Sequence, residues 1–271
     1  MRIGAGSYKL CLLLALGIVA PARAELLTAR IAAVKTGAGT LRDVTLTLDW
    51  PRGAPQGRLS LKASTLDFPA LSYAATQVAW QCPLLREGVD TWRCAGDVRV
   101  KGSAPRQLAV VFTAQGTQAV LTAGARRLAY STRAALPDRH EVELEKIPVA
   151  WLSAFLKGLW AEGRWTSGEL GGRVTMKTPT AAPLEVNTDL RVSDLGLETP
   201  DGLLAAAGVK GRLLVDYRDH AGSRTVDTQL VVSGGELLFD SLYTKFPASP
   251  VDIRIDARQQ GTAPWMLPRA V

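Results

Sequence analysis

Residues 184–192 read Leu184-Glu185-Val186-Asn187-Thr188-Asp189-Leu190-Arg191-Val192. Aliphatic residues and one threonine occupy the even positions, and charged or amide residues occupy the odd ones. An alternation with period two is typical of a β-strand that buries one face and exposes the other to water. Such strands favour antiparallel sheets, because parallel sheets are usually covered on both faces.

The same alternation recurs over 43–50, 58–63, 141–145 and 251–257. Apolar side chains that we expect to share one face in these stretches are Val44, Leu46, Leu48, Trp50, Leu59, Leu61, Leu184, Val186, Leu190, Val192, Val251, Ile253 and Ile255. We interpret four intervening segments as turns: 51–53, 102–105, Gly171-Gly172 and Gly234-Gly235. The sequence therefore predicts an all-β protein, an elongated and twisted antiparallel sheet that forms an open groove or a sandwich.

One segment departs from this alternation and predicts a short amphipathic helix over 148–160. Pro148 suits the first helical position, Gly163 suits the stop, and apolar residues follow at helical spacing: Val149, Leu152, Phe155, Leu156 and Leu159. The helix either caps an open end of the sheet or touches a membrane. Trp151, Trp160 and Trp165 favour a membrane contact, whereas the lack of a basic face disfavours it.

Residues 1–24 have the pattern of a secretory signal peptide. Arg2 and Lys9 precede an apolar run from Leu10 to Ala20, and Ala22-Arg23-Ala24 forms a cleavage site. The run is shorter than the roughly 20 residues that a membrane-spanning helix needs. We therefore expect cleavage after Ala24 and export to a bacterial periplasm.

Charge and cysteine content agree with an exported protein that does not bind nucleic acid. The chain has 32 basic and 25 acidic residues, and the signal holds three of the basic ones, so the exported part carries a net charge of only +4. No basic run with interleaved aromatic residues is present. Cys82 and Cys94 remain after cleavage and lie in neighbouring strand-like segments. In an oxidising compartment we expect them to form a disulfide across a hairpin.

No catalytic pattern stands out in the sequence, and we expect no enzyme activity, no cofactor and no metal. Ser167 lacks the glycine that would precede it in a nucleophile elbow. His140 and His220 have no nucleophile nearby in the sequence and are interpreted as surface residues. A zinc site needs three or four ligands, and the exported chain has only two histidines beside the two cysteines that we expect to be paired.

Three stretches resemble the AsmA-like envelope proteins of Gram-negative bacteria, with the YdbH-like group as the nearest in cadence, and one of the three runs from Gly208 to Val215. In the first, a strand ends in Ile147-Pro148, an apolar segment follows, and Ser167-Gly168-Glu169-Leu170 opens the next strand. The second runs from Leu230 through Gly234-Gly235-Glu236-Leu237 to Phe239. The resemblance covers roughly 142–257 and rests on motifs of low specificity.

The resemblance implies a function without catalysis. The resemblance implies a long twisted sheet rolled into an open groove, whose apolar face holds acyl chains. Proteins of this family are implicated in moving phospholipid between the inner and outer membranes. We therefore expect the apolar face to line a groove for phospholipid or another acyl-chain ligand. The alternative is a periplasmic scaffold or assembly factor that binds an envelope protein through a sheet edge or helix face.

We expect four segments along the chain. They are the signal peptide (1–24), an N-terminal β module with the disulfide hairpin (25–140), an AsmA-like β module with the short helix (141–258), and an irregular tail (259–271). The tail has no period. It is interpreted either as the product of a truncated or frameshifted reading frame or as a disordered end.

Overall fold

The protein is a single antiparallel sheet of 16 strands. A computed structural model describes residues 26–35, 39–68, 73–153, 162–178, 183–247 and 249–270. The strands are β1 (Leu26–Lys35), β2 (Thr40–Asp49), β3 (Gln56–Phe68), β4 (Tyr73–Arg86), β5 (Trp92–Arg99), β6 (Arg106–Thr113), β7 (Gly116–Ala123), β8 (Arg126–Arg133), β9 (Leu136–Pro148), β10 (Arg164–Lys177), β11 (Leu184–Glu198), β12 (Leu204–His220), β13 (Ser223–Phe239), β14 (Leu242–Lys245), β15 (Val251–Gln260) and β16 (Met266–Ala270).

The strands follow one another as a meander from β1 to β13. Each pairs with its neighbour in sequence. Both β14 and β15 pair with β13, β14 along residues 236–239 and β15 along residues 223–232. This order confirms the predicted all-β fold. It also decides between the two predicted forms, because there is one open sheet rather than two sheets packed as a sandwich.

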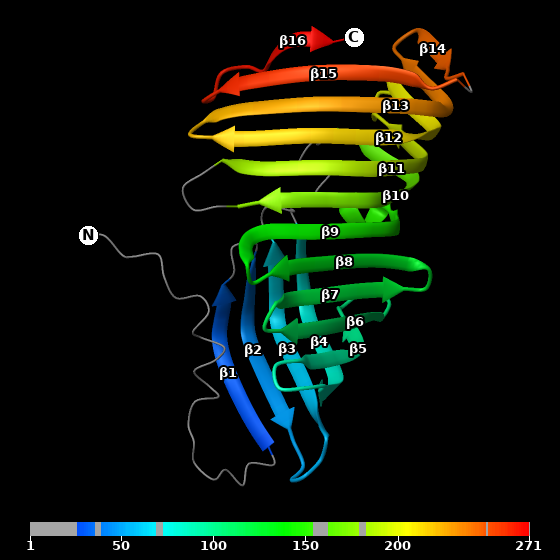
Figure 1. The fold of residues 1–271 in the computed structure, drawn as a ribbon. Coiled ribbons are helices and arrows are strands. Elements are labelled where there is room, and N and C mark those ends of the chain that lie inside the picture. The colour runs from blue at the N-terminus through cyan, green and yellow to red at the C-terminus, as the bar shows by residue number, and fades with distance from the viewer. Residues whose placement is uncertain are drawn as a thin grey trace.

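The sheet twists strongly along its length. In Figure 1 strands β1–β4 run steeply, whereas β7–β15 run across the view. Neighbouring strands rotate by about 20–25° relative to one another, so four intervals turn the strand direction by roughly 90°. The twist therefore arises from the chirality of the strands and requires no special linker.

The apolar alternation continues from strand to strand without changing sides. Leu46 lies opposite Leu61, which lies opposite Trp80. Farther along, Leu190 lies opposite Leu213, and Leu213 opposite Leu230. Side chains of directly opposed residues point to the same face, so the 13 candidate lining residues share one continuous face.

Three expectations require correction. Gly171-Gly172 and Gly234-Gly235 are not turns between strands but lie inside β10 and β13. The described part of the expected irregular tail, 259–270, is mostly sheet, since β15 extends to Gln260 and β16 pairs with β15 after a turn. The boundary placed between residues 140 and 141 falls inside β9, so the sheet runs continuously through it.

The predicted helix is described only in part. Val149–Leu152 form a single 3-10 turn, η2, in which Val149 is buried and Leu152 is half-buried. Phe155, Leu156 and Leu159 lie outside the described residues, as does the whole predicted signal peptide. No helix in the described ranges has the length and apolar character needed to cross a membrane.

The first strands pack their apolar face into a small core. Val44, Ala63, Ala75 and Val78 form a buried cluster, with Leu41, Leu61, Leu66, Tyr73 and Val98 among the side chains packed against it. Trp50 directly follows β2 and Trp92 begins β5, yet their ring centroids are only 5.8 Å apart in an edge-to-face contact. A contact over two intervening strands shows that the sheet curls toward its apolar face here.

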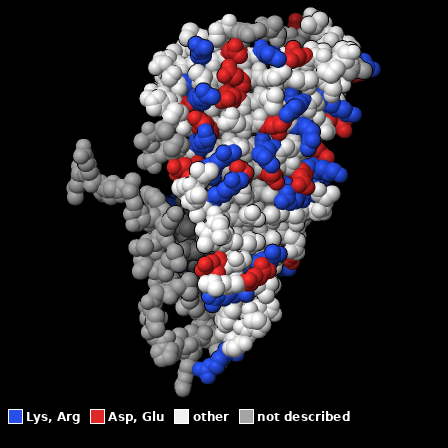
Figure 2. Space-filling model, viewed as in Figure 1, with Lys and Arg blue, Asp and Glu red and all other residues white. Residues whose placement is uncertain are grey.

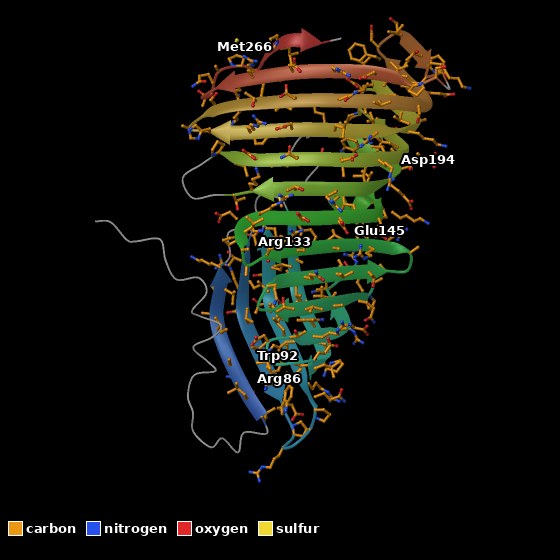
Figure 3. All side chains as sticks on the ribbon, in the orientation of Figure 1. Arg86, Trp92, Arg133, Glu145, Asp194 and Met266 are labelled. Atoms are coloured by element: carbon orange, nitrogen blue, oxygen red, sulfur yellow. A yellow bond between two sulfur atoms is a disulfide. The ribbon has the colours of Figure 1, made fainter. Side chains whose placement is uncertain are left out.

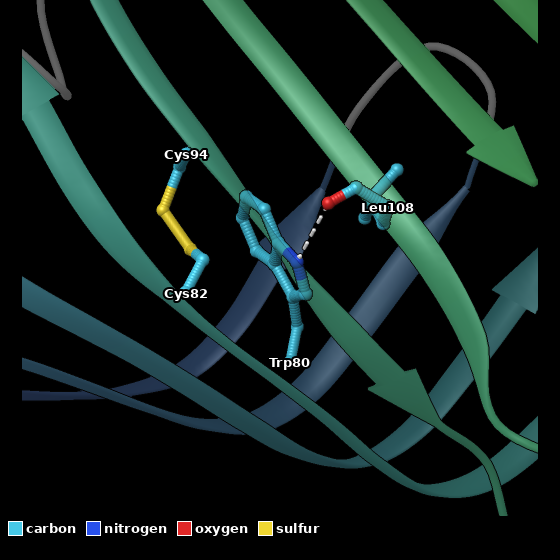
Figure 4. The surroundings of a disulfide bond; sticks show 4 residues. All are labelled: Trp80, Cys82, Cys94 and Leu108. Atoms are coloured by element: carbon cyan, nitrogen blue, oxygen red, sulfur yellow. Dashed lines mark hydrogen bonds between the residues drawn. A yellow bond between two sulfur atoms is a disulfide. The ribbon is translucent and has the colours of Figure 1, made fainter.

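The predicted disulfide is present. Cys82 of β4 and Cys94 of β5 are bonded and fully buried. Trp80 lies beside them, and its indole N–H donates to the Leu108 carbonyl at 3.2 Å (Figure 4). The bond closes a loop with a sequence separation of 12. It links the two strands on the apolar face of the sheet.

Removing the disulfide should lower stability without changing the fold. A Cys82→Ala/Cys94→Ala variant is expected to lose about 3 kcal/mol of unfolding free energy, because the unfolded chain gains the freedom of an open loop. Urea titration monitored by tryptophan fluorescence measures this loss. A variant whose unfolding midpoint matches the unreduced parent would contradict it. Alkylation of the unreduced native parent should label neither cysteine.

Candidate functional site

The apolar face of β9–β15 consists of rows of aliphatic side chains that run across the strands. One row contains Leu144, Leu190, Leu213, Leu230 and Ile253, and the next contains Val142, Val174, Val215 and Ile255 together with Thr188 and Thr228. Apart from Leu144, which is buried, these side chains are partly exposed. The rows cross six strands, β9 to β13 and β15, and five intervals of about 4.8 Å give the face a length of roughly 24 Å.

A line of β-bulges crosses the sheet at one end of these rows. The pairing register shifts at the same level in β9–β10, β10–β11, β11–β12 and β12–β13. Left-handed or glycine-specific backbone conformations mark the line at Lys146, Gly168, Asp194, Gly208 and Gly235. Bulges bend a strand and increase its twist. In Figure 1 the right-hand ends of these strands turn away from the viewer, and Figure 3 labels Asp194 on this side.

The bend turns the apolar face into a groove. Next to the bulges the row of Ile147, Val192 and Val232 is buried, with Ile147 0% and Val232 1% exposed. The rows farther from the bulges stay half-exposed. This gradient is expected where the strand ends fold over the face and cover the residues nearest the crease. The crease forms the floor of the groove, and the open rows form its first wall.

The strand ends beyond the bulges form the second wall, which is also apolar. Each bulge shifts the alternation by one residue, so Leu195 and Leu197 continue the face of Val192. The register aligns Trp165, Leu197, Ala206 and Leu237. Phe239 and Leu242 extend this wall at 61% and 66% exposure. Sequence reasoning missed this wall, because the shift at Asp194 breaks the period.

Side chains fix the bulges in place. The Ser167 hydroxyl donates to the Asp194 carbonyl at 2.9 Å, and the Ser233 hydroxyl donates to the Lys210 carbonyl at 3.4 Å. Lys210 and Asp194 also form an ion pair at 3.2 Å. These contacts join β10 to β11, β11 to β12 and β12 to β13, so the crease is continuous over four strands.

The opposite face is charged. Figure 2 shows Lys and Arg interspersed with Asp and Glu over the upper strands. Arg212 donates two hydrogen bonds of 2.7 Å to Asp189, and Arg173 donates to Glu143 at 2.7 Å. The hydrogen bond from Arg212 lowers the pKa of Asp189, and that from Arg173 lowers the pKa of Glu143. Both carboxylates are therefore ionised at neutral pH, and this face is wetted by solvent.

An open hollow lies on the charged face of the sheet. It is an open depression of about 410 Å³, and its lining includes Asn187, Leu214, Asp216, Asp227 and Asp256. Three aspartates lie opposite one another on β12, β13 and β15. Among the described residues no group of three or more His, Cys, Asp or Glu side chains is arranged to hold a metal ion. Most of the residues that line the hollow are polar or charged, unlike the rows of aliphatic residues on the apolar face.

The histidines and Ser167 occupy structural positions in the sheet. His140 accepts or donates a hydrogen bond of 2.9 Å with the Tyr130 hydroxyl, and it contacts the Thr178 hydroxyl at 3.1 Å. Burial raises the pKa of Tyr130. His220 closes the β12–β13 hairpin opposite Ser223. Ser167 binds a bulge carbonyl, as described above, so its hydroxyl is engaged in holding the crease.

Neither a protein-family model, nor a curated protein, nor a solved structure matches the chain. The function is therefore inferred from the geometry of the sheet.

Proposed function

We propose that the creased face of β9–β15 binds the acyl chains of phospholipid or a similar amphiphile in the periplasm, and helps to move them between the two membranes. The observation that carries this proposal is a long apolar groove whose walls are partly exposed while the reverse face is charged. A monomeric protein rarely exposes a contiguous apolar surface of this extent without a ligand or partner.

Binding of this kind needs few specific contacts. Each acyl methylene removed from water contributes about 0.8 kcal/mol, and aliphatic rows that continue across six strands can accept a chain along their length. A groove works by burial, so the proposal assigns no catalytic group. The resemblance to AsmA-like proteins supports the same function.

Lipid content tests the proposal directly. The exported protein, purified from periplasm without detergent, is expected to carry phospholipid or fatty acid that mass spectrometry detects after solvent extraction. A soluble periplasmic protein purified in parallel provides the background. Lipid at background level in the purified protein, combined with no binding of added palmitate, would contradict the proposal.

A scaffold that binds an envelope protein is the second candidate. It is favoured by the exposed apolar residues on and beside the edge strand β16, where Trp265, Met266 and Leu267 are 44–63% exposed. Exposed strand edges accept an added strand through main-chain hydrogen bonds. Crosslinking to a single envelope protein through this edge, with no lipid in the groove, is the result that would favour the scaffold.

A further inference from the structure

Arg106 places a positive charge on the apolar face of the sheet. It is the first residue of β6 and lies opposite Val98 of β5, which in turn lies opposite Trp80 of β4. Trp80 lies on the same face as the buried disulfide. An arginine in such surroundings is costly unless its charge is satisfied.

Trp151 contacts the Arg106 guanidinium without using the hydrogen-bond donors of Arg106. The guanidinium carbon lies 4.1 Å from the centre of the Trp151 ring, a cation–π contact. Stacking of this kind uses the face of the guanidinium, whereas its five N–H groups point outward in its plane. Within the described ranges the Arg106 guanidinium forms no ion pair and no hydrogen bond. The group is therefore held in position while its donors stay open.

Trp151 connects this cation to the floor of the groove. Ile147 and Val149 precede it at alternate positions, and they are 0% and 2% exposed. Val149 also lies against Gly168, where an added side chain would contact both Val149 and Leu195. The chain thus passes from the crease directly to the residue that stacks on Arg106, which lies near one end of the groove.

We propose that Arg106 binds the anionic group of an amphiphile whose acyl chain lies in the groove. This inference rests on the proposed function and adds to it the class of ligand and the position of its head. A guanidinium matches a carboxylate or a phosphate with two parallel hydrogen bonds. Its apolar surroundings strengthen the attraction relative to water.

Two ligands of equal chain length distinguish the contribution of the head group to binding from that of the acyl chain. Palmitate and hexadecanol share the acyl chain and differ in charge, so the ratio of their Kd values reports the contribution of the head. The wild-type protein is expected to bind palmitate at least about tenfold more tightly, as a hydrogen-bonded charge pair implies. In Arg106→Gln this preference should disappear while the Kd for hexadecanol stays unchanged, which also shows that the groove is intact.

Arg99→Gln is the matched control. Arg99 lies on β5, on the charged face of the sheet, where it forms an ion pair with Asp97. It should retain the preference for palmitate. If Arg106→Gln also retains it, Arg106 does not bind the head, although the groove function stands. If wild-type protein binds neither ligand, the proposed function itself fails. Inorganic phosphate should compete only weakly; competition equal to that of palmitate would show a free-anion site and overturn the inference.

Discussion

Leu213→Gln is expected to weaken palmitate binding at least about tenfold, whereas Leu214→Gln should leave the Kd within about twofold. Leu213 lies between Leu190 and Leu230 on the apolar face. Leu214 lies between Asp189 and Gln229 on the charged face. A bound acyl chain would cover the new amide at position 213 without offering it a hydrogen bond, at a cost of about 1–3 kcal/mol.

The two variants form a matched pair, since the same substitution is made at neighbouring positions of one strand. The loss of strand propensity is therefore similar in both. Titration with a fluorescent fatty acid, followed by displacement with palmitate, measures the two Kd values, and circular dichroism confirms that both variants fold. Equal Kd values for the two variants would place the ligand elsewhere, and the larger loss in Leu214→Gln would place it on the charged face.

Gly172→Ala is expected to destabilise the protein by at least about 3 kcal/mol, whereas Gly171→Ala should be neutral or stabilise it by up to about 1 kcal/mol. Gly172 has a φ of +134°, and a β-carbon there would lie 2.0 Å from the Asp189 carbonyl oxygen of β11. At Gly171 the nearest atom is 3.5 Å away, and the backbone suits an L-residue. The strain at position 172 involves backbone, which cannot move aside as a flexible side chain would.

The opposite signs make this prediction stringent. Alanine restricts the unfolded chain equally at both sites, so the difference between the variants reports the native state alone. Urea unfolding of each variant under the same conditions measures it. Similar unfolding free energies would show that β10 and β11 do not approach closely at Gly172, and that the crease is shallower than described.

Local pattern sufficed for most of the fold. The period-two stretch 184–192 predicted β11, and the similar stretches predicted β2, β3, β9 and β15, because a strand with one wet face must alternate. The pairing of Cys82 with Cys94 followed from two strand-like segments separated by a short turn. Both inferences depend on neighbours in sequence, and a meander keeps sequence neighbours adjacent in space.

The groove could not be predicted from the local pattern, because the bulges that bend the sheet interrupt that pattern. Asp194 and Lys146 shift the alternation by one residue. Aspartate adopts a left-handed backbone more readily than most residues, but the sequence does not distinguish Asp194 from the other aspartates and does not mark Lys146 at all. Gly234-Gly235 was interpreted as a turn, although it bends a strand that continues to Phe239. A glycine pair fits a turn and a bulge equally well, and only the pairing with β12 shows that the strand goes on.

The amino-acid sequence alone determined that the chain forms strands with one apolar and one charged face, since side-chain direction follows from the backbone period. The tertiary structure decided that the sheet stays single, and that its bulges align into a crease with a second apolar wall. Alignment of bulges is a property of five strands together, because each register shift must match that of the neighbouring strand, and no single stretch of sequence records that agreement.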